Sequence, residues 1–180
     1  MTKPWRLLSR RAGAAGYLPL WTETYELPDG THADWDICGR ARAVAVLALT
    51  PDGEIVLARQ FRPGPQRVLD ELPGGIVEDG EAVLDAAARE LREETGYGGQ
   101  CELAGTTWLS SFGRTQRFAV VCREARRIGP PAPDAGEFCE VVHLSLTAFR
   151  DHLRSGQLSD ADLGYLALDH LGLLGRPGHR

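Results

Sequence analysis

The sequence predicts an α/β (α+β) sandwich of mixed strands and helices, preceded by a layer of antiparallel strands. Three observations support this prediction. Short segments rich in apolar and aromatic residues are separated by Pro-Asp-Gly turns, which is typical of strands. One long segment, residues 81–95, contains no glycine or proline and favours a helix. Further helix-like segments follow near the C-terminal end.

Residues 1–40 are expected to form short antiparallel strands. Their aromatic residues, among them Trp5, Trp21 and Tyr25, are too frequent for a disordered arm. With 180 residues and 43% hydrophobic content, the chain can bury a substantial core. We therefore expect a strand extension at 1–40, one main domain at 41–175 and a tail at 176–180.

The main domain is expected to begin with a hairpin. Residues 41–49 form a nearly unbroken apolar run, Pro51-Asp52-Gly53 marks a turn, and residues 54–62 form the next strand. The remaining elements follow in the order strands 100–109, 117–122 and 138–146, then helices 147–154 and 161–174.

The central helix has recognisable ends and faces. Asp79 is a plausible N-cap, and Gly96 stands where a left-handed terminator belongs. At roughly 100° per residue, Leu84, Ala87, Ala88 and Leu91 form one apolar stripe. The other faces are therefore available for charged side chains.

Glu90 and Glu94 lie one turn apart on this helix, with Glu93 beside Glu90. Carboxylates so close repel one another unless a cation lies among them, and hard oxygen ligands suit Mg²⁺ or Mn²⁺. Residues 70–94 contain nine acidic residues and two arginines, a net charge of −7, whereas the whole chain carries −5. The alternative is a solvated helix face paired locally with Arg89 and Arg92.

Composition limits the classes of partner. The net charge of −5 argues against a nucleic-acid-binding protein, which requires a basic face. No run approaches the ~18 apolar residues of a membrane span, and the N-terminal residues lack the apolar region of a signal peptide. The four cysteines are widely spaced without a CxxC pair, so we expect reduced thiols, no zinc site and a cytoplasmic location.

Residues 75–97 read G-x5-E-x7-R-E-U-x-E-E-x-G-U, where U is a bulky apolar residue, and every fixed position is filled. This pattern resembles the Nudix box. The resemblance implies the Nudix fold, with a mixed sheet between helices. It also implies hydrolysis of a pyrophosphate that joins a nucleoside to another group, with Mg²⁺ (or Mn²⁺) as cofactor.

Segments outside the box are similar to the ADP-ribose pyrophosphatase branch of that family. They are residues 58–62, 70–75 and 140–144, and the N-terminal strand layer also fits. In that branch such a layer often builds a homodimer, so the resemblance implies a homodimer that acts on a small nucleotide substrate.

The resemblance implies roles for the box residues. Glu90 and Glu94 are expected to be the principal metal ligands, and Glu93 a third ligand or a water-activating carboxylate. The backbone carbonyl of Gly74 is expected to complete the metal site. Arg89 is expected to orient a neighbouring glutamate through a charge-assisted hydrogen bond.

The general base in this branch often comes from a late loop. Glu137 is the first candidate and Glu140 the second; the two roles of metal ligand and base are not separable by sequence.

Substrate contacts are expected from Arg62, Glu71, Phe112 and Arg114. Glu71 lies in one of the segments that resemble the branch, and either arginine is suited to hold a phosphate. Phe112 is suited to stack on a base or ribose, although a phenylalanine in such a run is also a candidate core residue. Arg62 is alternatively an exposed strand residue.

The branch commonly carries Ser-Pro-Gly followed by an acid, but this chain has Phe112 for the proline and Gln116 for the acid. The resemblance implies ADP-ribose or another nucleoside diphosphate sugar as the substrate, and this departure counts against ADP-ribose itself. The alternatives are a dinucleotide, an oxidised nucleoside triphosphate, or no turnover in a nucleotide-sugar-sensing module.

Overall fold

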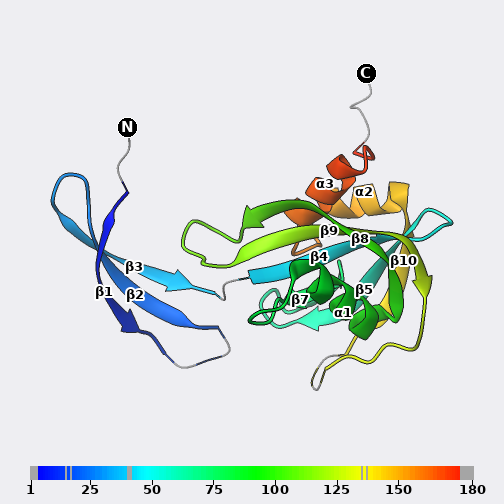
Figure 1. Cartoon of the computed structure of the whole chain (residues 1–180), viewed down its shortest axis with the longest axis horizontal. Helices are drawn as coiled ribbons and strands as arrows, with labels where there is room; N and C mark the ends of the chain where they lie inside the picture. Colours follow the sequence, from blue (N-terminus) through cyan, green and yellow to red (C-terminus); the bar gives the residue numbers. More distant parts are fainter. Residues whose placement is uncertain are drawn as a thin grey trace. The chain divides into compact units, whose positions relative to one another are not determined.

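The computed structural model describes residues 4–14, 16, 18–39, 42–134, 136 and 138–174. The chain divides into two units (Figure 1). The smaller unit is Met1–Arg42 with Trp108–Gln116, and the larger unit is Ala43–Thr107 with Arg117–Arg180. The division lies close to the boundary expected at residue 40, but the segment 108–116 joins the smaller unit. The expected tail at 176–180 lies outside the described residues.

The smaller unit contains a three-stranded antiparallel sheet. Its strands are β1 (Arg6–Ala12), β2 (Leu20–Glu26) and β3 (His32–Cys38), with β2 in the centre. Trp21 pairs with Ala12 on one side and Ile37 on the other. The turn between β2 and β3 contains Gly30 with φ 82°, a backbone angle that glycine adopts readily. The expected antiparallel strands are confirmed.

The carboxylate of Glu23 in β2 is fully buried, although the sheet is only three strands wide. It accepts hydrogen bonds from the Tyr25 hydroxyl at 2.6 Å, from Arg10 at 2.5 Å and from Arg114 at 2.6 and 2.7 Å. Burial alone raises the pKa of Glu23, but the hydrogen bonds from Tyr25, Arg114 and Arg10 outweigh burial and lower the pKa. Glu23 therefore ties β1 and the segment 108–116 to β2.

The larger unit is built on a seven-stranded sheet with the order β10-β5-β4-β9-β8, in which β6 pairs with β5 and β7 with β4. The strands are β4 (Arg42–Leu49), β5 (Glu54–Arg62), β6 (Arg67–Glu71), β7 (Gly74–Ile76), β8 (Tyr97–Trp108), β9 (Gln116–Arg127) and β10 (Glu140–Ser145). The expected hairpin is confirmed, because Ala48 of β4 pairs with Val56 of β5.

Helices cover both faces of this sheet, with α1 (Val83–Thr95) on one side and α2 (Leu146–Arg154) and α3 (Ala161–His170) on the other (Figure 1). Side chains of a strand alternate between faces, so neighbouring residues of β4 enter different cores. Val46 packs in the cluster that contains Leu91 of α1, and Leu47 packs in the cluster that contains Phe149 of α2. The expected sheet between helices is confirmed.

The ends of α1 agree only partly with expectation. Gly96 terminates the helix as predicted, with φ 76° and its N–H donating to the Arg92 carbonyl. The predicted N-cap, Asp79, is wrong: the N-cap is Ala82, and no side chain caps it. The reason is the loop before the helix, where the Glu81 carboxylate accepts from the Glu78 N–H at 3.0 Å and the chain turns through Gly80 first.

No helix within the described ranges is long and apolar enough to cross a membrane. Cys38, Cys101, Cys122 and Cys139 are all free thiols, and Cys122 is the buried one.

Replacing Glu23 with Gln is expected to lower the free energy of unfolding of the smaller unit by about 1–3 kcal/mol at neutral pH, because two arginines lose a buried charged acceptor. A lowered pKa stabilises the fold fully above the ordinary value of 4.5, and this stabilisation is lost as pH falls through the folded-state pKa. The difference between wild type and variant should therefore shrink on acidification.

Denaturant unfolding followed by tryptophan fluorescence measures this effect, because all four tryptophans belong to the smaller unit. The matched control is Glu26→Gln, which removes an exposed ion pair with Arg6 from the same strand. Equal losses of stability in the two variants would contradict the role of Glu23.

Candidate active site

The segment that leads into the box runs directly against the backbone of β4. Gly74 and Gly75 of β7 pair with Ala45 and Val44. A Cβ placed on Gly74 would overlap the Val44 carbonyl oxygen, so a residue with a side chain does not fit without moving the strand. This close approach brings the β7 backbone to α1.

Gly75 leaves room for a carboxylate. A Cβ at this position would lie 2.5 Å from Oε1 of Glu90 and 2.8 Å from its Cδ. The Glu90 carboxylate therefore occupies the space in front of the Gly75 backbone. The glycine that opens the box is required by this contact, since its own φ is not in the left-handed region.

Glu94 is the most deeply buried of the three box glutamates, with 2% of its surface exposed. Its Oε2 accepts from the Gly74 N–H at 3.0 Å, and its Oε1 lies 3.4 Å from Nε2 of Gln60 on β5. The backbone carbonyl of Gly74 was expected to complete a metal site. The contact seen between Gly74 and Glu94 is instead a hydrogen bond from the Gly74 N–H. Glu94 is thus held by two segments that are far away in the sequence.

Arg89 links the loop before α1 to the helix. Its guanidinium donates to Glu81 at 3.0 and 3.2 Å, to the Ile76 carbonyl at 3.0 Å, to Glu90 at 2.9 Å and to Glu93 at 3.1 Å. The hydrogen bonds to Glu81, followed by those to Glu90 and Glu93, raise the pKa of Arg89 above its usual range. Arg89 therefore contacts two of the three box glutamates and the loop before the helix.

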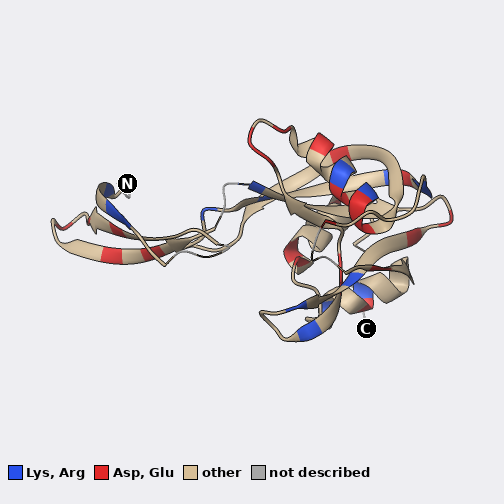
Figure 2. Ribbon diagram, turned by 90° about the horizontal axis from the view of Figure 1, so that it is seen from below, with Lys and Arg blue, Asp and Glu red and all other residues tan. Residues whose placement is uncertain are grey.

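Local ion pairing, the alternative interpretation of this helix face, is also present, since Arg92 lies 3.7 Å from Glu93. Figure 2 shows the charged residues, with red and blue bands close together on one helix of the larger unit. The two interpretations are compatible, because the arginines contact Glu90 and Glu93 whereas Glu94 is buried against Gly74.

The chemistry of these donors fits a divalent cation. Glu90, Glu93 and Glu94 present oxygen ligands from one side of α1, and the space before Gly75 is shaped by the lack of a side chain. Among the described residues, no group of three or more His, Cys, Asp or Glu side chains is already arranged to hold a metal ion. Because Arg89 draws Glu90 and Glu93 toward itself, metal binding requires their carboxylates to reorient.

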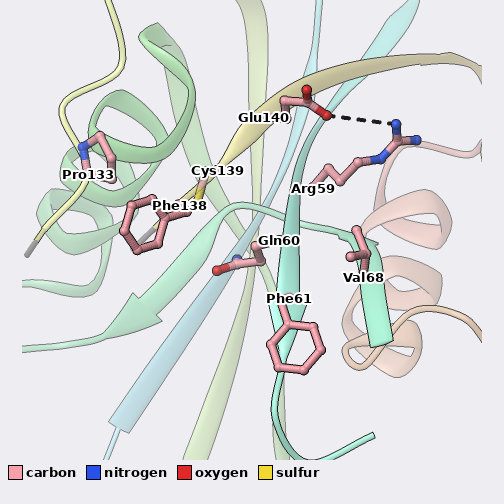
Figure 3. Close-up of a pocket in the computed structure, with 8 residues that line it drawn as sticks. All are labelled: Arg59, Gln60, Phe61, Val68, Pro133, Phe138, Cys139 and Glu140. Carbon is pink, nitrogen blue, oxygen red and sulfur yellow. Dashed lines mark ion pairs between the residues drawn. The ribbon is translucent and has the colours of Figure 1, made fainter. Parts of the chain in front are cut away.

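A cavity of about 420 Å³ opens beside Gln60 in the larger unit (Figure 3). Phe61 and Phe138 line it with highly exposed rings, 60% and 86% accessible. Arg59 and Glu140, the second candidate for the general base, also line it and form an ion pair at 4.0 Å. Gln60 links the lining of this cavity to Glu94, because its Nε2 lies 3.4 Å from Oε1 of that glutamate.

The residues expected to contact substrate fall into two groups. Arg62 donates to Glu71, which is fully buried and also accepts a hydrogen bond from the Ser159 hydroxyl. The Glu71 carboxylate is therefore an internal acceptor that holds the Arg62 guanidinium. Phe112 and Arg114 belong to the smaller unit, where Phe112 is half exposed and Arg114 bonds to Glu23.

Two residues near the site, Glu137 and Gln60, differ in how far the sequence predicts them. Glu137, the first candidate for the general base, lies outside the described residues. Gln60 was not singled out, although strand periodicity gives a signal: residues 56, 58 and 60 of β5 share one face, and Val56 packs in the α1 cluster.

Replacing Gly75 with Ala is expected to weaken Mn²⁺ binding about tenfold or more, because the new methyl group displaces the Glu90 carboxylate. Thermal unfolding should change little, since the clash is with the end of a flexible side chain. Electron paramagnetic resonance titration of free Mn²⁺ measures the affinity. Gly64→Ala is the matched control, because a Cβ there meets no atom within 4 Å; Mn²⁺ affinity equal to wild type in Gly75→Ala would refute the argument.

Comparison with known proteins identifies the family of the chain. The chain matches the NUDIX domain over residues 39–162. It is 33% identical to an ADP-ribose pyrophosphatase from Bacillus subtilis over 164 residues, which cover 87% of this chain and 85% of the relative. It is 31% identical to a methanol dehydrogenase activator from Bacillus methanolicus over 149 residues, 79% of this chain and 78% of the relative.

A solved crystal structure of an ADP compounds hydrolase superposes with a TM-score of 0.79, covering 96% of this chain and 98% of that chain at 19% identity. This likeness shows the fold. The family follows from the domain match and the sequence relatives, and the filled box lies within the matched range. The chain belongs to the NUDIX domain family.

Proposed function

We propose that this protein hydrolyses the pyrophosphate bond of a nucleoside diphosphate linked to another group, with ADP-ribose or another nucleoside diphosphate sugar as substrate. The observation that carries the proposal is the convergence of two box glutamates of α1, Glu90 and Glu94, on the glycine backbone of β7. The relative from Bacillus subtilis is an ADP-ribose pyrophosphatase, and an ADP-sugar pyrophosphatase from mouse is 33% identical over 131 residues.

Hydrolysis of a diphosphate requires a nucleophile to approach a polyanion. Mg²⁺ (or Mn²⁺), when bound, neutralises charge on the phosphate oxygens and polarises the attacking water. Glu90 and Glu94 are proposed as the principal ligands, with Glu93 as a third ligand or as the carboxylate that activates water. The backbone carbonyl of Gly74 is proposed to complete the site.

Arg89 is proposed to hold the glutamates in register before and during turnover. Its contacts to Glu81 and the Ile76 carbonyl anchor the guanidinium to the loop, so that it can release a carboxylate to a cation without losing its own position. This anchoring is a reason for an arginine rather than a lysine, because only the guanidinium donates in several fixed directions.

Glu137 is proposed as the general base, with Glu140 as second candidate. The neighbouring residue Phe138 lines the same cavity as Gln60, which contacts Glu94, and this supports a role for the loop. Either Arg62, whose orientation depends on Glu71, or Arg114 is proposed to hold a substrate phosphate. Phe112 is proposed to stack on the base or ribose, a use that its half-exposed ring permits.

We also propose a cytoplasmic homodimer formed through the smaller unit. Its sheet exposes large apolar side chains, among them Trp5, Leu7, Leu20 and Trp35, and such patches favour association. The free thiols are consistent with a reducing compartment. The mass from light scattering checks the assembly, and a value equal to the 19.6 kDa of one chain would contradict it.

Substrate choice is tested with a panel assayed in Mg²⁺, in Mn²⁺ and after chelation. The panel contains ADP-ribose, GDP-mannose, UDP-glucose, NADH, a diadenosine polyphosphate and an oxidised nucleoside triphosphate, with products identified by mass. The highest kcat/KM is expected for ADP-ribose or another nucleoside diphosphate sugar. After chelation of the metal, no turnover of any substrate is expected. Preference for the dinucleotides or the triphosphate would select those alternatives, and binding without turnover would indicate a sensing module.

Two variants control this assay. Glu94→Gln is expected to lower kcat by about 10²-fold or more in a protein that still folds, as checked by circular dichroism, because it weakens metal binding. Glu137→Gln is expected to lower kcat by about 10²-fold with less effect on KM, as for loss of a general base. If Glu140→Gln has this effect instead, the base is Glu140.

A further inference from the structure

Two of the four thiols lie together on neighbouring strands. Cys101 is on β8 and Cys122 on β9, and these strands are hydrogen-bonded neighbours in the sheet. The two thiols hydrogen-bond to each other. No residue of the candidate active site takes part in this contact.

The pair is placed between solvent and the core. Cys122 is fully buried in the apolar cluster under α1, and Cys101 is partly buried at the edge of the same cluster. The Cys122 sulfur also lies close over the β8 backbone, since a Cβ on Gly99 would be only 2.9 Å from it. An oxidant from solvent therefore reaches the Cys101 thiol first, and the buried Cys122 thiol is in place to react with the oxidised Cys101.

The arrangement suits a cross-strand disulfide. Neighbouring strands of a sheet lie about 4.8 Å apart, and the two thiols hydrogen-bond to each other within one cluster, so the two sulfurs are near enough to be joined. The hydrogen bond from Cys122 lowers the pKa of the Cys101 thiol, whereas the same bond and burial raise the pKa of Cys122. Cys101 is thus the better nucleophile of the two.

We propose that Cys101 and Cys122 are a site of reversible oxidation, which a peroxide or a small-molecule disulfide converts into a cross-strand disulfide. With hydrogen peroxide, the Cys101 sulfur attacks one peroxide oxygen, giving a sulfenic acid and one water. The Cys122 sulfur then attacks the sulfur of the Cys101 sulfenic acid and displaces its hydroxide. The hydroxide takes the Cys122 thiol proton and leaves as a second water. A dithiol reductant reverses the bond by exchange.

The disulfide would form directly behind α1. Ala87 and Leu91 of the helix pack in the cluster that holds Cys122, so the bond joins β8 and β9 at the place where the helix rests on them. The oxidised protein should unfold at a higher temperature, by roughly 5–10 °C, because the cross-link lowers the conformational entropy of the unfolded chain.

Peptide mapping tests the proposal on the full chain. The folded protein is treated with hydrogen peroxide or oxidised glutathione, remaining thiols are alkylated, and tryptic peptides are separated without reductant. Cleavage after arginine puts the four cysteines on four different peptides, with Cys101 on 93–114 and Cys122 on 118–123. A linked pair of these two peptides, two hydrogens lighter than the sum, is the expected product.

The double variant Cys38→Ser/Cys139→Ser is the matched control and should form the same linked pair with the same rise in melting temperature. Cys101→Ser should abolish the linked peptide pair and the rise in melting temperature, and this substitution leaves the fully buried core residues unchanged. The proposal is overturned if Cys101 and Cys122 are both alkylated after treatment, if Cys101 stops at a mixed disulfide or sulfinic acid, or if the linked peptides contain Cys38 or Cys139.

Discussion

The guanidinium of Arg89 is the interaction on which the candidate site depends. It joins the carboxylates of Glu81, Glu90 and Glu93 and also binds the Ile76 carbonyl. Like charges at this spacing would otherwise drive the side chains apart and separate the loop from the helix. One planar cation with several fixed donors thus keeps an acidic surface assembled.

The rest of the site follows from how α1 is seated. The expected apolar stripe is only partly right, because Leu84 and Ala88 are exposed. The face formed by Ala86, Ala87 and Leu91 packs on the side of the sheet that carries Val44, Val46 and Val120, which directs Glu94 toward β7 and β5. The two glycines of β7 allow the backbone to approach both β4 and the helix. Apolar packing on one face of α1 therefore fixes the helix, and the fixed helix positions the carboxylates on its other face.

Local patterns predicted those elements whose signals are local. The helix end at Gly96, the hairpin of β4 and β5 and the two C-terminal helices agree with the structure. Asp79 as N-cap was wrong because the loop before the helix makes one more turn, stabilised by Glu81. Glu23 could not be placed in this way. An acid in a strand is expected to face solvent, but Arg10 of β1 and Arg114 of the segment 108–116 both donate to its buried carboxylate.

The sequence by itself determined the family, the acidic helix and the set of glutamates suited to a metal, because all of these depend on residues within one helix and the loop before it. Only the tertiary structure decided that Gln60 reaches Glu94, that Glu71 holds Arg62 and Ser159, and that Cys101 meets Cys122. These contacts join different segments, some more than thirty residues apart. Strand order and register bring them together, and no local pattern of residues encodes either one.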